Sequence, residues 1–232
     1  MNKNEILLSV VIPVFNEAPT VGDVIGRLKV TMQKIGFKNE IIVVDDCSRD
    51  KSLKISRSQG VEVYSLKEHM GKGYALRVGF AKAKGEIIAT VDSDASHCPE
   101  ELPLLLNPIL QDQADFVIGS RFLHKKPASA RKLNAIGVRL FNVLIRILTR
   151  TGVSDSQSGY RAMKDDILVD LKLNSGEYEI ESEMLVKTAR RGFRVKEVPI
   201  SFEQRTYGKS RLDPVVDGFK ILSSIILAYI KG

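Results

Sequence analysis

Two carboxylates stand two residues apart at the end of an apolar segment. Residues 86–91 have the composition of a buried strand, and Asp92 and Asp94 follow directly. Side chains alternate across a strand, so both carboxylates project to the same side of it. Adjacent carboxylates repel each other, and a hard divalent cation such as Mg²⁺ or Mn²⁺ is their simplest partner. Such a cation takes its remaining ligands from water and phosphate oxygens. The spacing therefore favours a site for a phosphate-bearing substrate.

The same residue types also have an ordinary structural use, because Asp and Ser after a strand form turns and cap helices. A second acidic pair strengthens the metal hypothesis. Asp45 and Asp46 follow another apolar segment, 40–44, and ligands of an open α/β sheet bind beyond the carboxyl ends of its strands. We expect the two acidic strand ends to face one crevice.

Apolar segments alternate with segments of helical spacing through the first half of the chain. Strands are expected at 7–14, 40–45, 61–66, 86–91 and 115–119, and helices at 21–35, from about 50 to 59, at 71–83 and at 99–109. Ser48 is placed to cap the second helix, and Gly71-Lys72-Gly73 indicates a turn that starts the third. That triplet lacks the full spacing of a phosphate-binding loop. Short connections between alternating strands and helices predict an α/β fold, in which helices cover both faces of a mostly parallel sheet.

The second half of the chain has a different pattern. A long amphipathic helix is expected over 130–150, with Lys132, Arg139 and Arg146 at seven-residue intervals on one side. It is followed by a polar loop at 154–159, a helix near 179–190, a strand at 195–202, a polar loop at 203–212 and an apolar segment at 215–230. The unbroken apolar run in that last segment is much shorter than the roughly 20 residues that a membrane-spanning helix needs.

Composition indicates one enzyme-sized domain. The chain has 232 residues, 44% of them hydrophobic, and a net charge of +7. The basic character is local, since residues 121–150 hold eight Lys and Arg and no Asp or Glu. Such a surface suits a phosphorylated substrate, an anionic lipid surface or nucleic acid. Membrane docking is favoured over nucleic acid, because no nucleic-acid-binding module accompanies the basic helix. The first residues lack the pattern of a secretory signal, so a cytoplasmic location is expected, with Cys47 and Cys98 as free thiols.

Short motifs run along nearly the whole chain. They are Val10-Val-Ile-Pro-Val-Phe-Asn-Glu17, Val43-Val-Asp-Asp-Cys-Ser48, Asp92-Ser-Asp94, Ile118-Gly-Ser-Arg-Phe122, Ser154-Asp-Ser-Gln-Ser-Gly-Tyr-Arg161 and the segment from Val198 to Arg211. In this order they resemble the family 2 inverting glycosyltransferases with the GT-A fold, and the later ones resemble the dolichol-phosphate mannosyltransferase branch. The resemblance implies one GT-A domain over 1–232. Within it, 1–120 would bind the nucleotide sugar, 121–213 would bind the acceptor, and 214–232 would form a C-terminal apolar helix.

The resemblance also assigns site residues by position. The residues expected around the base and ribose are Pro13, Phe15, Glu17, Val44 and Asp46. The donor and its diphosphate are expected on Asp92, Ser93, Asp94, Arg205 and Arg211. Mg²⁺ or Mn²⁺ is expected on Asp92, Asp94 and Ser96, where the Ser stands in place of a Gln that some relatives have. The acceptor phosphate is expected on Arg121, Arg131 and Ser158. The expected catalytic set is Asp92, Asp94 and Arg121.

The chemistry of these residue types agrees with the assignments. Cleavage of a sugar from a nucleoside diphosphate leaves two negative charges, which a metal ion and guanidinium groups stabilise. A lipid monophosphate is already ionised near pH 7, because its second pKa is about 6, and needs no strong general base. The expected reaction transfers a hexose with inversion, mannose from GDP-mannose, to polyprenyl (dolichyl) phosphate. It would occur at the cytosolic face of a membrane, where the C-terminal segment would lie on the bilayer or pack against a small membrane anchor subunit.

Two alternatives stay open from the sequence. The first keeps the chemistry and changes the donor to UDP-glucose or another sugar nucleotide. The second, from another class, is a non-catalytic subunit that binds a sugar nucleotide or a lipid.

Overall fold

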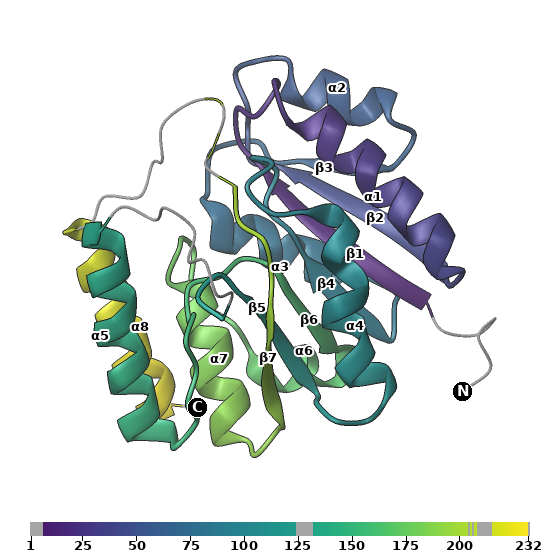
Figure 1. Cartoon of the computed structure of the whole chain (residues 1–232). Helices are drawn as coiled ribbons and strands as arrows, with labels where there is room; N and C mark the ends of the chain where they lie inside the picture. Colours follow the sequence, from purple (N-terminus) through teal and green to yellow (C-terminus); the bar gives the residue numbers. More distant parts are fainter. Residues whose placement is uncertain (1–6, 124–131, 204, 206, 208–214, 232) are drawn as a thin grey trace.

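Seven strands of the described residues form one sheet, in the order β3-β2-β1-β4-β6-β5-β7 (Figure 1). The structure is a computed structural model that describes residues 7–123, 132–203, 205, 207 and 215–231. The bounds of the strands are β1 Leu7–Val14, β2 Lys38–Asp45, β3 Glu62–Ser65, β4 Ile87–Thr90, β5 Phe116–Ser120, β6 Arg161–Lys164 and β7 Val195–Pro199. Neighbouring strands are parallel except where β6 pairs with β4 and β5. The predicted α/β fold with a mostly parallel sheet is confirmed.

Helices cover both faces of the sheet (Figure 1). Their bounds are α1 Val21–Ile35, α2 Ser52–Ser58, α3 Lys72–Lys82, α4 Leu102–Leu110, α5 Lys132–Thr149, α6 Asp165–Leu171, α7 Ile180–Arg190 and α8 Val216–Lys231, with a 3-10 turn at Pro99–Glu101. α1 and α4 belong to one core cluster, and α6 and α7 belong to another on the opposite face. α5 and α8 pack on α7 and form a further layer beyond it.

The central strands are apolar on both sides because both of their faces are buried. Val11 and Ile12 are successive residues of β1, and both are 0% exposed. They point to opposite faces and belong to different core clusters. A strand in this position appears in the sequence as a continuous apolar run, which is why β1, β2 and β4 could be predicted.

Some details differ from the predictions. α3 begins at Lys72, as the glycine-bearing turn indicates, but Ser48 does not cap α2, which begins at Ser52. The Ser48 hydroxyl accepts a hydrogen bond from the backbone N–H of Asn16 (2.9 Å) instead. The strand expected at 195–202 ends at Pro199. Neither β6 nor α6 was predicted, because both are short and lie in a polar stretch.

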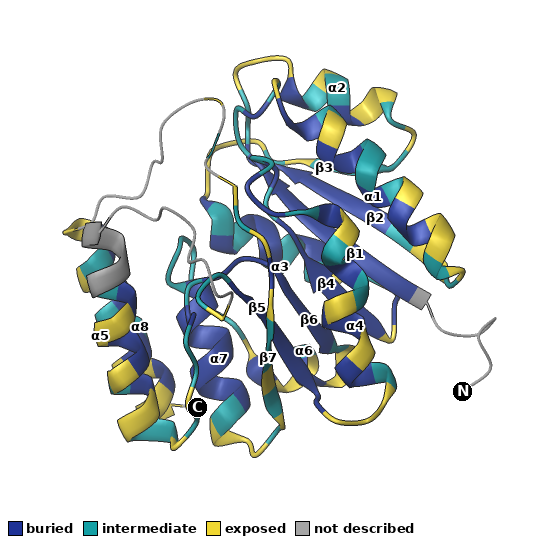
Figure 2. Cartoon of the chain, in the orientation of Figure 1, coloured by how far each residue is buried: buried dark blue, intermediate teal, exposed yellow. Residues whose placement is uncertain are grey.

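The outer helices leave apolar side chains exposed (Figure 2). On α5 these are Leu140, Val143 and Ile147, and on α8 they include Phe219 and Ile230. Within the described part of the chain, no helix is both long and apolar enough to cross a membrane. Cys47 and Cys98 are free cysteines, as expected.

Candidate active site

The neighbouring strands β1 and β4 bring two of the predicted motifs together beyond their carboxyl ends. The buried hydroxyl of Ser93 donates a hydrogen bond to the carbonyl oxygen of Pro13 (2.9 Å). The carbonyl oxygen of Ser93 accepts one from the hydroxyl of Thr20 (2.7 Å). These bonds fix the loop that follows β4 against the loop that follows β1.

Asp94 lies next to three of the other predicted residues. Its Oδ1 accepts hydrogen bonds from the backbone N–H (3.0 Å) and the hydroxyl (2.6 Å) of Ser96, which is 3% exposed. Its Oδ2 lies 3.8 Å from Nη1 of Arg205, and Nη2 of the same guanidinium forms an ion pair with Glu17. The structure therefore brings together Glu17, Asp94, Ser96 and Arg205.

Asp92 belongs to a buried ion cluster. Nζ of Lys72 lies 2.6 Å from Oδ1 of Asp92 and 2.8 Å from Oε1 of Glu181. Oδ2 of Asp92 lies 3.8 Å from Nδ1 of His97, a histidine that is 2% exposed. Because Lys72 begins α3 and Glu181 lies in α7, the cluster joins the two halves of the chain.

Burial and charge together determine the protonation of this cluster. Burial opposes ionisation of Asp92, but the charges of Lys72 and Arg121 and the hydrogen bond from Lys72 favour it, and the pKa of Asp92 lies below its usual value. Burial opposes the charge of Lys72 too, yet Asp92 and Glu181 raise its pKa. Burial lowers the pKa of His97, although Asp92 opposes this. At neutral pH the cluster therefore contains an ionised Asp92, a charged Lys72 and a neutral His97.

Sequence reasoning missed Lys72 and Glu181. The interpretation of 71–73 as a helix-starting turn is correct for the backbone: Gly71 has a φ of +94°, and a Cβ there would come within 2.5 Å of the carbonyl oxygen of Gly176. The one signal for Lys72 was a lysine between two glycines, and no local feature distinguishes Glu181 from its neighbours. The sequence alone does not show that His97 is buried, with 2% of its surface exposed.

The residues around Asp92 and Asp94 fit a hard divalent cation. The carboxylate of Asp92 packs on Gly159, where a Cβ would come within 2.5 Å of Oδ2, so a side chain at 159 would displace it. Two carboxylates supply the oxygen ligands that Mg²⁺ and Mn²⁺ prefer. Among the described residues, no three His, Cys, Asp or Glu side chains are grouped so that they could hold a metal ion. The geometry thus fits a cation that takes most of its ligands from water and substrate phosphates.

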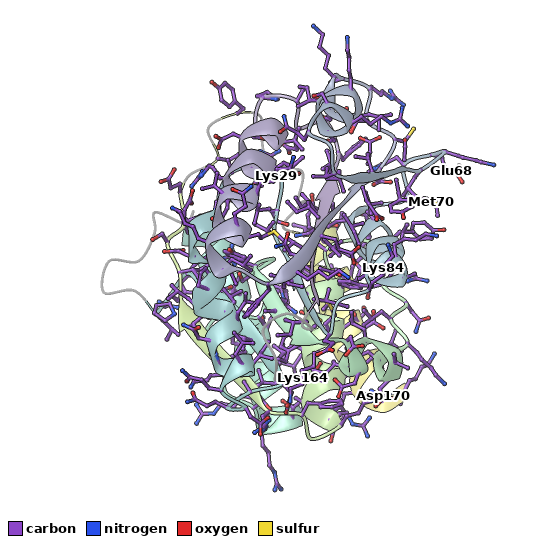
Figure 3. All side chains as sticks on the ribbon, turned by 90° about the vertical axis from the view of Figure 1, so that its right-hand side faces the viewer. Lys29, Glu68, Met70, Lys84, Lys164 and Asp170 are labelled. Carbon is purple, nitrogen blue, oxygen red and sulfur yellow. The ribbon has the colours of Figure 1, made fainter. Side chains whose placement is uncertain are left out.

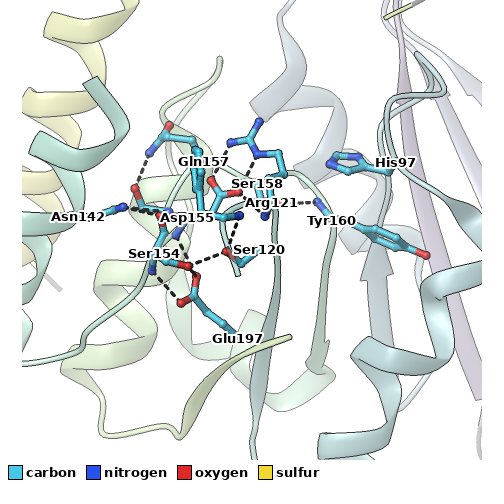
Figure 4. A network of polar contacts seen from close by, with 12 residues as sticks. His97, Ser120, Arg121, Asn142, Ser154, Asp155, Gln157, Ser158, Tyr160 and Glu197 are labelled. Atoms are coloured by element: carbon cyan, nitrogen blue, oxygen red, sulfur yellow. Dashed lines mark hydrogen bonds and ion pairs between the residues drawn. The ribbon is translucent and has the colours of Figure 1, made fainter. Parts of the chain in front are cut away.

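Arg121 follows β5 and is held by Asp155 (Figure 4). Its Nε and Nη2 donate to the two carboxylate oxygens of Asp155 (2.6 and 2.7 Å), and its backbone N–H donates to the same group (3.1 Å). Glu197 of β7 accepts hydrogen bonds from the backbone N–H groups of Ser154 (2.7 Å) and Asp155 (2.9 Å). This network fixes the plane of the Arg121 guanidinium and leaves its Nη1 unused by Asp155.

The loop that carries Asp155 is held from the other side by Arg161, which is 1% exposed. The Arg161 guanidinium donates to the carbonyl oxygens of Ser156 (2.7 Å), Ser158 (2.8 Å) and Glu181 (2.6 Å). Burial lowers the pKa of Arg161 to about 10. Ser158, one of the predicted acceptor residues, is itself fully buried in this loop.

Phe15 and Asp46, both expected near the nucleotide, are linked through His69. Asp46 accepts hydrogen bonds from the backbone N–H groups of Met70 (2.7 Å) and Gly71 (2.8 Å), and Nδ1 of His69 lies 2.7 Å from its carboxylate. The rings of His69 and Phe15 are stacked, with centroids 3.9 Å apart and an interplanar angle of 11°. Asp46 thus anchors the loop after β3 beside Phe15.

The remaining predicted residues lie as follows. Pro13 is buried and meets the site through the hydrogen bond from Ser93, and Val44 is buried in the apolar core. Arg131 and Arg211 lie outside the described residues.

Comparisons with known proteins identify the family. The model of glycosyl transferase family 2 matches residues 9–171. An uncharacterised protein of Methanocaldococcus jannaschii, MJ1222, is 37% identical over 98% of this chain and 93% of its own length. A dolichyl-phosphate hexose transferase of Haloferax volcanii is 30% identical over 94% of this chain and 92% of its own length.

Solved structures agree on the fold. The glucosyl-3-phosphoglycerate synthase of Mycobacterium tuberculosis, solved with Mn²⁺, UDP and phosphoglyceric acid, has a TM-score of 0.79 and 21% identity, over 97% of this chain and 79% of that one. This similarity shows the GT-A fold, and the expected fold family is confirmed. The family match, the two archaeal relatives and the strand-end acids lead to one conclusion: the chain belongs to glycosyltransferase family 2.

Proposed function

We propose that this glycosyltransferase moves a hexosyl unit from a sugar nucleotide to polyprenyl phosphate, with mannose from GDP-mannose as the preferred donor. One observation carries the proposal: the guanidinium of Arg205 lies 3.8 Å from Asp94, and the guanidinium of Arg121, held on Asp155, is near enough to Asp92 to help lower the pKa of that carboxylate. Carboxylates suit a cation, and guanidiniums suit phosphates. The relative from Haloferax volcanii that is named a dolichyl-phosphate hexose transferase supports the choice of acceptor.

Asp92 and Asp94 are the residues that would hold Mg²⁺ or Mn²⁺, with Ser96 hydrogen-bonded to Asp94. When bound, such a cation supplies positive charge next to the departing nucleoside diphosphate. Structures of glucosyl-3-phosphoglycerate synthase with Mn²⁺ and UDP and with Mg²⁺ and UDP support this choice of ion. Arg205 is the guanidinium nearest to these carboxylates in the described structure, and we assign it to the donor phosphates.

Transfer then proceeds by direct displacement. An oxygen of the acceptor phosphate attacks the anomeric carbon of the hexose, and the bond from that carbon to the diphosphate breaks with its electron pair on the leaving oxygen. Arg121 orients the acceptor phosphate through the N–H groups that Asp155 leaves free. The acceptor is already ionised at neutral pH and needs no general base. A single displacement inverts the configuration at the anomeric carbon.

A donor screen tests the proposal. The protein is incubated with polyprenyl phosphate, Mg²⁺ or Mn²⁺, and radiolabelled GDP-mannose or UDP-glucose, and label in the lipid extract is counted. Label from GDP-mannose is the expected result. Label from UDP-glucose alone would show that the donor is UDP-glucose and not GDP-mannose. If both donors bind but neither labels the lipid, the proposed acceptor is wrong.

We also propose that the enzyme docks on the cytosolic face of a membrane through α5, with α8 on the bilayer or against a small membrane anchor subunit. α5 exposes basic and apolar side chains together, a combination that favours anionic bilayer surfaces. These side chains are Arg139, Leu140, Val143, Arg146 and Ile147. Docking through α5 would keep the phosphate headgroup of the acceptor lipid near the candidate active site, because Asn142 of α5 is hydrogen-bonded to the loop that carries Asp155.

Liposome sedimentation tests the docking. Each basic residue near an anionic surface contributes about 1 kcal/mol. Replacing Lys132, Arg139 and Arg146 together by Gln should therefore weaken binding by about a hundredfold at low salt and by less at high salt. Unchanged sedimentation with anionic liposomes would contradict docking through α5.

A further inference from the structure

Lys72 and Glu181 form a partly buried ion pair beside Asp92 that the transfer chemistry described above does not use. The Nζ atom of Lys72 lies 2.8 Å from Oε1 of Glu181 and 2.6 Å from Oδ1 of Asp92. The side chains of Lys72 and Glu181 are 17% and 4% exposed. One lysine thus lies between two carboxylates, one of them assigned to the cation and the other unassigned.

The Glu181 carboxylate is left with unused hydrogen-bonding capacity. Its Oε2 is buried and has no hydrogen-bond partner among the described residues, and its Oε1 meets only Lys72. An ionised carboxylate has about four acceptor positions, and buried ones are normally satisfied. Arg161 does not use this carboxylate, because its guanidinium donates to the backbone carbonyl oxygen of Glu181.

A second buried glutamate on the same helix shows what a structural role looks like. Glu183 is 4% exposed and pairs with Lys187 (2.7 Å). Its carboxylate also accepts hydrogen bonds from the backbone N–H groups of Asn174 (3.0 Å) and Ser175 (2.8 Å). Both oxygens of Glu183 are therefore used within the protein, in contrast to Oε2 of Glu181.

The charge of the cluster determines what kind of group it can bind. The carboxylate of Glu181, which is not assigned to the cation, repels a phosphate, so the donor diphosphate belongs on the side of Arg205 and the cation. A neutral group with adjacent hydroxyls fits better, because a carboxylate accepts from one hydroxyl and an ammonium ion donates to the next. The ring of Tyr178, 6.0 Å from Nζ of Lys72, adds an aromatic wall. Such a mixture of a few polar groups and an aromatic face is typical of small-molecule sites.

We propose that Lys72 and Glu181 bind hydroxyl groups of the donor hexose and so help to decide which sugar is transferred. This inference rests on the proposed function, since it needs a sugar nucleotide in the site. It assigns the donor diphosphate to Arg205 and the cation, and the sugar ring to the lysine–glutamate pair. Glu181 is thereby a specificity-determining residue for the hexose.

A comparison of two ligands isolates the sugar contact. Isothermal titration with Mn²⁺ present measures the affinity for GDP and for GDP-mannose. Glu181→Gln should weaken the binding of GDP-mannose by about ten- to a hundredfold, the loss expected for one charge-assisted hydrogen bond. It should change the affinity for GDP by less than twofold. If the affinities for GDP and GDP-mannose fall equally, or if neither falls, the assignment of Glu181 to the sugar is wrong. Glu181→Asp, which keeps the charge and withdraws the carboxylate by one methylene, gives the same comparison if Glu181→Gln does not fold.

Glu183→Gln is the matched control, because it removes the charge of a buried glutamate in the same helix. It should lower thermal stability and leave the ratio of the two affinities unchanged. A changed ratio in this variant would assign the effect of Glu181 to the helix rather than to the sugar. If the wild-type protein binds GDP-mannose and UDP-glucose no better than GDP and UDP, the proposed contact with the sugar is wrong. If it binds none of the four ligands, the proposed function fails too.

Discussion

Replacing Asp155 by asparagine removes the charge that holds Arg121. Asp155 is fully buried and accepts three hydrogen bonds from Arg121, at 2.6, 2.7 and 3.1 Å. Asparagine keeps the shape but offers one carbonyl oxygen, and its amide N–H groups would face the guanidinium. At least one charge-assisted hydrogen bond of about 1.5–3 kcal/mol is lost, and losing one partner of a buried pair costs about 3–5 kcal/mol. We expect Asp155→Asn to lower the free energy of unfolding by about 3 kcal/mol.

The same change should affect catalysis through the position of Arg121. The guanidinium is oriented chiefly by the bonds that tie Nε and Nη2 to Asp155, with the ring of Phe202 5.1 Å from its Cζ. A misplacement of about 1 Å in a group that orients a substrate costs on the order of a hundredfold in rate. We expect kcat/KM for the acceptor to fall by about that factor, while the KM for the sugar nucleotide changes little.

Urea denaturation and steady-state kinetics measure the two effects separately. Asp170→Asn is the matched control, because Asp170 is exposed on α6 and lies well away from Met70 (Figure 3). It should change the free energy of unfolding by less than about 0.5 kcal/mol and leave kcat/KM unaltered. If Asp155→Asn behaves like Asp170→Asn in both assays, Asp155 does not position Arg121 and the network is incidental.

Two further predictions concern the cation and the pH dependence of stability. Asp94→Asn should remove most turnover and leave the fold intact; near-wild-type activity at saturating Mg²⁺ or Mn²⁺ would contradict a metal-binding role. Hydrogen bonds from Arg194 and Lys164 hold the pKa of Asp115 well below its usual value, so its stabilisation is present above about pH 4 and is lost as the pH falls through the folded-state pKa. Asp115→Asn should therefore lower the free energy of unfolding by about 1–2 kcal/mol at pH 7 and by progressively less below pH 4, in urea titrations. A difference that stays constant with pH would refute this. Activity should not change, because Asp115 precedes β5 and Arg121 follows it, so the two residues lie at opposite ends of that strand.

Local signals in the sequence were sufficient for most elements and for the acids at the strand ends. β4 is buried on both faces, so it appears as an apolar run whose end is marked by Asp92 and Asp94. Helical spacing located α1, since that helix buries one side. β6 escaped prediction because it has four residues, begins with Arg161 and ends with Lys164. It becomes a strand only through its neighbours β4 and β5, which the sequence does not place beside it.

The groups that hold the site were the hardest to predict, for an electrostatic reason. A charge that is placed in a poorly solvated site must have a partner, because the cost of burying it alone is several kcal/mol. The sequence therefore implied that Asp92 and Arg121 each need a counter-charge, but gave no information about its position in the chain. The structure supplies Lys72 for Asp92 and Asp155 for Arg121. Asp155 belongs to one of the sequence motifs, but a carboxylate in a polar loop gives no local sign that it pairs with Arg121.

Charge pairing also shows that the candidate active site is built from both halves of the chain. Lys72 comes from the half that carries the strand-end acids, and its second partner, Glu181, comes from the other half. Arg205, from the late polar loop, contacts Glu17 and Asp94 of the first half. If the halves came apart, Lys72 would lose Glu181, and Asp94 would lose Arg205. A fragment of 1–120 alone would therefore hold Asp92 and Asp94 without Glu181 and Arg205, two of the groups that determine the charge balance around them.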